Sequence, residues 1–203
     1  MKIICIGLNY HDHIQELKKE PPEHPLFFLK PETAIICRNR PFFLPDFSNE
    51  VHYEVELLLK INKLGKHIQK KFAHTYYDEI GLGIDFTARD LQATAMKFGY
   101  PWEISKSFDG SAVVGKFVPK NHFQTINNLS FSLLQNGQTV QSGNSKNMIF
   151  DFDSIIAYIS QFITLKIGDL IFTGTPAGVG KVNINDHLEG FLENEKFFDC
   201  RIK

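Results

Sequence analysis

Three carboxylates in the middle of the chain have the residue types and the spacing of a divalent-metal site. Glu54 and Glu56 lie in a run, residues 51–61, whose alternating apolar residues predict a β-strand. Because residues i and i+2 of a strand point to the same face, these two carboxylates should lie side by side. Asp85 ends a second apolar run, where an unpaired carboxylate would be costly. Three such oxygen ligands suit Mg²⁺ or Mn²⁺, with coordination positions left for water or substrate.

Two other interpretations of these carboxylates are weaker. A Glu-x-Glu pair alone is more typical of a solvated strand face, and it is Asp85 that favours a metal site. A zinc site is disfavoured because no Cys or second His occurs at zinc-ligand spacing.

His13 and Glu16 form a candidate pair for proton transfer. They are spaced i, i+3 in a short helix predicted over residues 9–19, so they share one face. A carboxylate that orients an imidazole is the usual way to make a general base. Such pairs also occur by chance on solvated helices, and His11, two residues away, should point elsewhere.

A glycine-rich loop and several polar residues could bind a carboxylate substrate. Residues 174–180 follow an apolar strand but lack the Gly-Lys-Ser/Thr ending of a P-loop and the glycine spacing of a dinucleotide fingerprint. The loop is either a tight turn or a site where backbone amides and the Thr175 hydroxyl hold a carboxylate. Arg89 and Gln92 lie one turn apart on a predicted helix, and Lys106 follows it. Basic groups beside a metal would bind a carboxylate, although each alone is more typical of a surface.

The remaining patterns predict the elements that position these groups. Strands are expected over residues 2–7, 27–30, 51–61, 80–86, 170–173, 187–192 and 196–202. Asn136-Gly137 predicts a hairpin between residues 130–135 and 138–141. Helices are expected over residues 9–19, from an N-cap at Thr87 with Asp90 as its partner to about Phe98, and over residues 151–162 with an apolar face of Ile155, Ile156, Ile159 and Phe162. We therefore predict one β-rich domain, residues 1–203, with a few short helices around it.

Composition and charge limit the classes of function. The chain has 203 residues, 43% hydrophobic and 22% charged, with a net charge of -1, so it is globular and lacks the basic footprint of a nucleic-acid binder. No apolar run is long enough to cross a membrane, and the N-terminal one is too short for a signal peptide. Cys5, Cys37 and Cys200 are too few for a disulfide framework. We expect a cytoplasmic protein with reduced thiols that contacts neither nucleic acid nor membrane.

Six motifs, in chain order, resemble those of the fumarylacetoacetate hydrolase family. They are Gly7-Leu8-Asn9-Tyr10-His11-Asp12-His13 with Glu16, Phe28-Leu29-Lys30-Pro31, His52-Tyr53-Glu54-Val55-Glu56, Asp85-Phe86-Thr87-Ala88-Arg89-Asp90, Pro101-Trp102 with Lys106-Ser107-Phe108, and Gly174-Thr175-Pro176 with Gly178-Val179-Gly180. Each motif alone is weak, but six in order across nearly the whole chain are specific. The chain is most similar to the short single-domain members, which act as acylpyruvases and as oxaloacetate decarboxylases or tautomerases.

This resemblance implies a mixed α/β, β-rich fold of the β-roll type, with a few short peripheral helices, and a homodimer. It implies Mg²⁺ or Mn²⁺ on Glu54, Glu56 and Asp85, and a catalytic pair of His13 and Glu16 on a helix that closes over the substrate as a lid. The remaining implied positions are catalytic Lys106 and substrate-binding Arg89, Gln92, Thr175 and Lys30. The chain departs from many relatives at Asp109-Gly110-Ser111-Ala112, where they have a proline-containing turn. This departure could alter the choice of substrate.

We therefore expect a metal-dependent enzyme of small 2-oxo acids. It would cleave the C–C bond of 3-acylpyruvates, or decarboxylate or tautomerise oxaloacetate. The alternative is an enzyme of an aromatic ring-cleavage pathway, either a fumarylpyruvate-type hydrolase or a relative of the 2-hydroxyhepta-2,4-diene-1,7-dioate isomerases. An inactive binding or scaffold protein of the same fold is less favoured, because every expected metal ligand and both residues of the pair are present.

Overall fold

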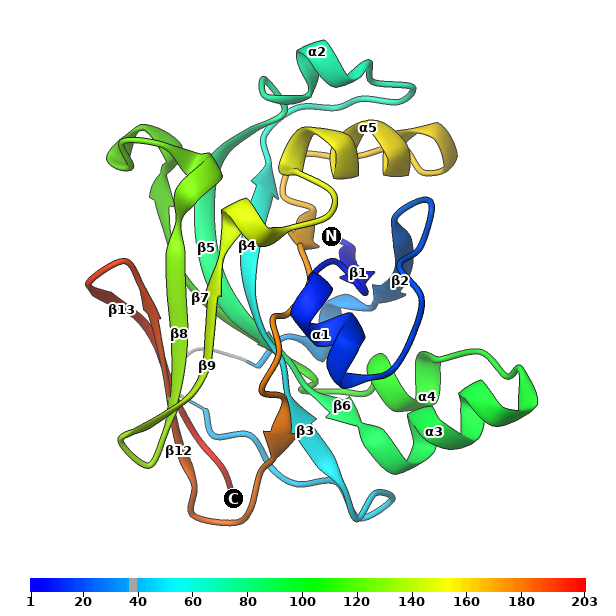
Figure 1. The fold of residues 1–203 in the computed structure, drawn as a ribbon, viewed down its shortest axis with the longest axis vertical. Coiled ribbons are helices and arrows are strands. Elements are labelled where there is room, and N and C mark those ends of the chain that lie inside the picture. The colour runs from blue at the N-terminus through cyan, green and yellow to red at the C-terminus, as the bar shows by residue number, and fades with distance from the viewer. Residues whose placement is uncertain (37–39) are drawn as a thin grey trace.

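A mixed six-stranded sheet runs through the centre of the molecule (Figure 1). The computed structural model describes residues 1–36 and 40–203. In spatial order the strands are β2 (Leu26–Lys30), β1 (Ile3–Gly7), β10 (Leu170–Phe172), β4 (Val55–Ile61), β5 (Tyr77–Asp85) and β7 (Ala112–Pro119). The pairing of β1 with β10 is parallel, and the other pairings in this sheet are antiparallel.

Two smaller sheets complete the β-structure. One contains β11 (Gly180–Lys181), β3 (Val51–Tyr53) and β6 (Thr87–Ala88). The other contains β13 (Glu195–Arg201), β12 (His187–Leu192), β8 (Ser130–Gln135) and β9 (Gln138–Asn144). The hairpin predicted at Asn136-Gly137 is confirmed, and both turn residues have positive φ, 54° and 80°.

Short helices lie around the sheets (Figure 1). The α-helices are α1 (His11–Glu16), α2 (Lys70–Ala73), α3 (Arg89–Phe98), α4 (Glu103–Lys106) and α5 (Phe152–Phe162). The 3₁₀ turns are η1 (Glu32–Ala34), η2 (Lys120–His122), η3 (Ile126–Asn128) and η4 (Ser145–Asn147). The prediction of a mixed, β-rich fold with short peripheral helices is confirmed. None of the helices in the described part of the chain is long and apolar enough to cross a membrane.

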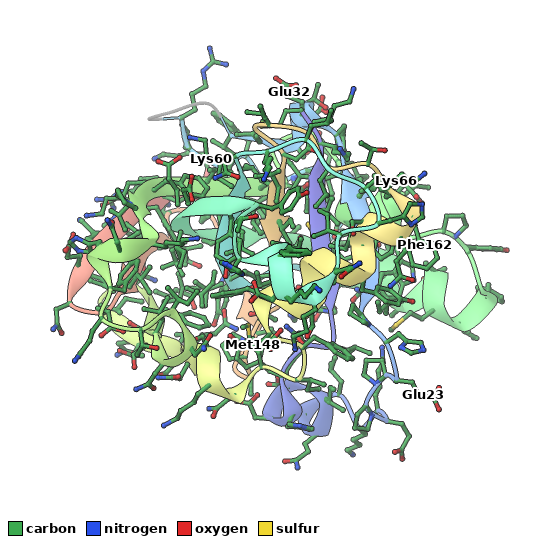
Figure 2. All side chains as sticks on the ribbon, turned by 90° about the horizontal axis from the view of Figure 1, so that it is seen from above. Glu23, Glu32, Lys60, Lys66, Met148 and Phe162 are labelled. Carbon is green, nitrogen blue, oxygen red and sulfur yellow. The ribbon has the colours of Figure 1, made fainter. Side chains whose placement is uncertain are left out.

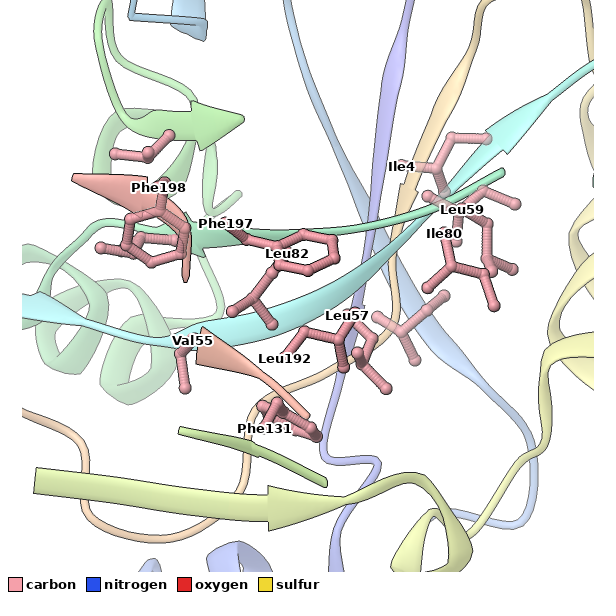
Figure 3. Close-up of a cluster of buried hydrophobic side chains, with 14 of the residues drawn as sticks. Ile4, Val55, Leu57, Leu59, Ile80, Leu82, Phe131, Leu192, Phe197 and Phe198 are labelled. Carbon is pink, nitrogen blue, oxygen red and sulfur yellow. The ribbon is translucent and has the colours of Figure 1, made fainter. Parts of the chain in front are cut away.

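The main core lies between the six-stranded and the four-stranded sheets. Figure 3 shows Leu57 and Leu82 of the first sheet packed near Phe131 and Leu192 of the second. A second cluster, which includes Cys5, lies on the other face of the central sheet. Strand β4 is therefore buried on both faces, with Leu57 in one cluster and Leu58 in the other. This double burial explains why the face that carries Glu54 and Glu56 is also shielded from water.

Several predicted boundaries differ from the structure. The strand predicted over residues 51–61 is divided at Glu54 into β3 and β4. The helix predicted over residues 9–19 is only six residues long. The N-cap prediction at Thr87 was wrong, because Thr87 lies in β6 and Asp90 instead accepts hydrogen bonds from Ser48 and Asn49. Phe162 does not join the buried face of α5 but is 57% exposed at its end (Figure 2).

Two of the three cysteines, Cys5 and Cys200, are buried free thiols, as predicted. Cys37 lies outside the described residues.

At the start of helix α5, the contribution of a helix cap to the free energy of unfolding can be compared with that of an exposed ion pair. The Asp151 carboxylate is its N-cap and accepts a 2.7 Å hydrogen bond from the Ser154 amide. It also pairs with Lys70, but both side chains are more than half exposed. We expect Asp151→Ala to lower the free energy of unfolding by about 1 kcal/mol through the lost cap. Lys70→Ala should change it by less than about 0.5 kcal/mol, because exposed ion pairs contribute little.

Urea denaturation of both variants measures these changes. Asp151→Asn is the matched control, since asparagine caps as well as aspartate but removes the charge. If Asp151→Asn and Lys70→Ala cost as much as Asp151→Ala, then the ion pair and not the cap stabilises the helix.

Candidate active site

Strand pairing brings the three predicted metal ligands together. Strand β4 begins just after Glu54, and the antiparallel strand β5 ends at Asp85. The Asp85 amide donates a 2.9 Å hydrogen bond to the Glu54 carbonyl, and Glu56 pairs with Gly83. Carboxylate oxygens of Glu54, Glu56 and Asp85 lie within 4.8 Å of one another, and the residues are at most 5% exposed.

Cations surround part of this carboxylate cluster. The Lys106 ammonium donates to Glu54 at 2.7 Å and to Asp85 at 2.9 Å, and it also donates to the Thr87 hydroxyl. Arg89 donates to the second oxygen of Glu54. Burial by itself lowers the pKa of Lys106, but the charges of Asp85 and Glu54 outweigh it and raise that pKa above its usual value.

Glu56 has no such cationic partner in the part of the chain that the structure describes. Its carboxylate accepts one hydrogen bond, 2.7 Å long, from the Gly174 amide. Burial, followed by the negative charges of Asp85 and Glu54, raises the pKa of Glu56 well above its ordinary value. For Glu54, burial acts in the same direction, but Lys106 and Arg89 reverse it and lower the pKa. The cluster therefore has an excess of negative charge on its Glu56 side.

The donor set fits a divalent cation. All three side chains offer carboxylate oxygens, the ligands preferred by Mg²⁺ and Mn²⁺. Among the described residues, Asp85 Oδ1 has no well-aligned hydrogen-bond donor, although the Lys30 ammonium lies 2.8 Å away. A bound cation would stabilise Glu56, which has no ion-pair partner among the described residues, whereas Asp85 is paired with Lys30 and Lys106.

The predicted pair of His13 and Glu16 forms, and His13 borders the same pocket as the carboxylates. His13 Nδ1 lies 3.0 Å from Glu16 Oε2, and Glu16 also accepts a 3.2 Å hydrogen bond from the Gly178 amide. Because Nδ1 is bound to Glu16, Nε2 is the ring nitrogen left for proton exchange with a substrate or water.

The loop predicted to hold a substrate carboxylate binds two carboxylates of the protein itself. Its Gly174 amide holds Glu56, and its Gly178 amide holds Glu16. Gly174 has φ 101°, and a Cβ there would lie 2.7 Å from Asn9 Cβ, so the backbone requires glycine. The Thr175 hydroxyl borders the pocket and accepts from Gln141, so its own proton remains available for a substrate oxygen.

Of the predicted substrate-binding residues discussed next, two border the pocket and one lies behind the carboxylate cluster. Arg89 and Gln92 border the pocket and are hydrogen-bonded to each other at 2.6 Å. Lys30 does not border it but lies behind Asp85, where its ammonium also donates to the Ser111 hydroxyl at 2.8 Å. Lys30 is thus positioned to orient Asp85 and not to touch a ligand.

Gln141 is a site residue that the sequence did not reveal. Its side chain accepts from the Val55 amide at 2.9 Å and donates to Thr175 and to the Pro176 carbonyl. It therefore fixes the glycine-rich loop against the start of β4. A buried glutamine on a hairpin strand has no motif around it, so only the fold identifies it.

Side-chain hydrogen bonds join the segment that carries the pair to the rest of the protein. At its start the Asn9 side chain is bonded to the Thr173 and Phe150 carbonyls, and at the end of α1 Glu16 reaches Gly178. Helix α1 is short, and its N-cap residue, Tyr10, makes no capping hydrogen bond through its side chain. We expect residues 11–25 to exchange amide hydrogens rapidly in the ligand-free protein and to become protected by oxalate with Mg²⁺.

Hydrogen exchange with mass spectrometry measures this protection, and the amides of β12 are the internal control because no residue of that strand borders the pocket. High protection of residues 11–25 that oxalate does not change would contradict a closing lid and indicate a preformed pair.

The sequence profile of the fumarylacetoacetate (FAA) hydrolase C-terminal family matches residues 2–203. The chain belongs to the fumarylacetoacetate hydrolase family. It is 40% identical over 201 residues to the mitochondrial oxaloacetate tautomerase of Mus musculus. This alignment covers 99% of the chain and 91% of the mouse protein. It is 41% identical over 182 residues to the mitochondrial oxaloacetate decarboxylase of Dictyostelium discoideum, 89% of the chain and 84% of that protein.

Solved structures of the fumarylacetoacetate hydrolase family have the same fold. The fumarylpyruvate hydrolase of Pseudomonas aeruginosa, solved with Mn²⁺ and pyruvate, superposes with a TM-score of 0.93 at 32% identity, covering 100% of the chain and 89% of that structure. A family protein from Yersinia pestis gives a TM-score of 0.95 at 37% identity, over 100% of the chain and 93% of that structure. The family recognised from the six motifs is therefore confirmed, and the chain is an enzyme of that family.

Proposed function

We propose that the protein is a divalent-metal-dependent enzyme of 2-oxo acids that hydrolyses 3-acylpyruvates and decarboxylates or tautomerises oxaloacetate. The observation that carries this proposal is one pocket bordered by three buried carboxylates and by His13, whose ring is hydrogen-bonded to Glu16. We propose that residues 1–203 act as a single catalytic domain, in a homodimer, in the cytoplasm.

Glu54, Glu56 and Asp85 would hold the metal, with Mg²⁺ preferred and Mn²⁺ as the substitute. When bound, the metal supplies a site for the carboxylate and 2-oxo oxygens of the substrate and stabilises the negative charge that develops on the 2-oxo oxygen. Lys106 and Arg89 hold Glu54 in place, so they keep the ligand oxygens oriented.

In hydrolysis, His13 takes a proton from water while Glu16 holds its ring. The water oxygen attacks the distal carbonyl, the C3–C4 bond breaks, and its electron pair passes to C3. C3 then takes up a proton, which gives a carboxylic acid and pyruvate. For oxaloacetate, CO₂ leaves instead and no water adds. Tautomerisation moves a proton between C3 and the 2-oxo oxygen.

A substrate panel tests this proposal. Acetylpyruvate hydrolysis, oxaloacetate decarboxylation and oxaloacetate tautomerisation are followed after EDTA treatment and again after addition of Mg²⁺ or Mn²⁺. We expect activity only with added metal. No turnover of any of these acids with either metal would overturn the proposal.

The second candidate is a ring-cleavage enzyme acting on longer dienedioates. It is favoured by the likeness to the fumarylpyruvate hydrolase and to a 2-hydroxyhepta-2,4-diene-1,7-dioate isomerase of Mycobacterium marinum, at 31% identity and TM-score 0.87. Fumarylpyruvate in the same panel separates the two candidates, because a pocket suited to short acids should turn it over more slowly.

A further inference from the structure

One cation at the pocket has no role in holding the carboxylate cluster. Lys19 borders the pocket together with Arg89 and Lys106. Arg89 and Lys106 are both bound to Glu54. Within the described residues, the Lys19 ammonium makes one contact, 3.1 Å long, with the thioether sulfur of Met96. Because a thioether is a weak acceptor, the donors of Lys19 remain available to a ligand.

The backbone holds Lys19 at a fixed point of the lid. Helix α1 ends with Lys18 in the left-handed conformation, φ 52°. The Lys18 amide donates to the Gln15 carbonyl and the Lys19 amide to the Ile14 carbonyl, at 3.0 and 3.1 Å. This pattern is a Schellman motif, which closes the helix with both bonds. It places Lys19 three residues beyond Glu16, and Figure 1 shows the chain after α1 passing near α3, which carries Met96.

The surroundings of Lys19 favour an anion beside it. Burial, followed by the positive charge of Arg89, lowers the pKa of Lys19 from its usual value, and the more weakly acting negative charge of Glu54 does not reverse this. Two cations that border one pocket would both be stabilised by a negative group between them.

The balance of charges around the pocket also favours an anionic ligand. The carboxylates that border the pocket are matched by an equal number of Lys and Arg side chains: Glu54, Glu56 and Asp85 against Lys19, Arg89 and Lys106. A divalent cation would leave two positive charges. A dianionic substrate would balance them, whereas a monoanion would leave one positive charge uncompensated.

We propose that Lys19 binds the second carboxylate of a 2-oxo dicarboxylic acid and thereby makes the enzyme prefer four-carbon diacids to acylpyruvates whose acyl end is uncharged. This inference rests on the proposed function, because the first carboxylate must be held at the metal site. Since Lys19 lies on the lid segment, a bound diacid would also join that segment to the rest of the site.

Two unreactive hydroxy acids test the preference directly. Malate and 2-hydroxybutyrate differ only in a carboxylate in place of a methyl group at the far end, so calorimetry with Mg²⁺ measures the effect of that carboxylate without turnover. The wild type should bind malate about 10-fold more tightly, the effect of one partly exposed charged hydrogen bond. Lys19→Gln should remove this preference.

Lys18→Gln is the matched control, since Lys18 is the exposed neighbouring lysine and does not border the pocket. It should retain the preference for malate. In the tautomerisation of oxaloacetate, Lys19→Gln should raise KM about 10-fold and change kcat less than about threefold, because the proton moves between C3 and the 2-oxo oxygen and the C4 carboxylate does not react.

Oxalate separates failure of this inference from failure of the proposed function. Oxalate has no distal group, so its Mg²⁺-dependent affinity should be the same in the wild type and in Lys19→Gln. If oxalate does not bind the wild type with Mg²⁺, the proposed function and the inference both fail. If oxalate binds but the wild type does not prefer malate, or Lys19→Gln keeps that preference or weakens oxalate binding equally, only the inference is overturned.

Discussion

Glu56→Gln is expected to lower kcat/KM by at least about 10³-fold for every 2-oxo acid that the enzyme uses. A bound metal typically supplies several kcal/mol of charge stabilisation, and that amount corresponds to such a factor. Glu56 is the best ligand for this test because, apart from the Gly174 amide, it has no hydrogen-bond or ion-pair partner among the described residues. A glutamine oxygen can still accept from that amide. By contrast, loss of Glu54 would leave Lys106 and Arg89 buried without their common partner.

The same substitution separates metal binding from folding. In the wild type, Mg²⁺ should raise the thermal midpoint of unfolding, because it binds the folded protein only. In Glu56→Gln this rise should be absent, whereas the midpoint without Mg²⁺ should be unchanged or higher, since a buried and poorly compensated charge is removed. Glu79→Gln, on the exposed part of β5, is the control and should behave as wild type. An unchanged activity and an unchanged Mg²⁺ effect in Glu56→Gln would exclude Glu56 as a ligand.

The carboxylate cluster was predictable because strand geometry is simple. A period of two residues places Glu54 and Glu56 together, and the apolar run that ends at Asp85 marks a buried strand. What the pattern could not supply is the pairing of β4 with β5, which brings Glu54 to Asp85. That pairing depends on the packing of the whole sheet between two apolar clusters.

Residues that act through long-range contacts escaped prediction. Gln141 reaches the site from the hairpin formed by β8 and β9, and Lys19 meets Met96 from 77 residues away in the sequence. The error at Thr87 has the same origin, because its hydroxyl binds Lys106 and cannot cap α3. The secondary-structure propensity of a residue depends on its own segment of the chain. A functional site combines side chains from several segments, and their contacts can override that propensity.

His13→Ala is expected to slow acylpyruvate hydrolysis by about 10²–10⁴-fold, which is the usual contribution of general-base catalysis. The ring is 3.0 Å from Glu16 and borders the pocket, so it is placed to take a proton from the attacking water. Decarboxylation of oxaloacetate should fall much less, because no water has to be activated when CO₂ leaves. The measurement is kcat for both reactions on one enzyme preparation with saturating Mg²⁺.

The comparison between the two reactions distinguishes a proton-transfer role from a structural one. His13 is buried in α1, so its removal could also loosen the lid, and a loosened lid would slow both reactions alike. His11→Ala controls for loss of a histidine from the same helix, since His11 is exposed and does not border the pocket. Equal losses of hydrolysis and decarboxylation in His13→Ala would mean that His13 holds the lid closed. A selective loss of hydrolysis, with His11→Ala unchanged, assigns the base to His13, because only the hydrolytic reaction consumes a water molecule.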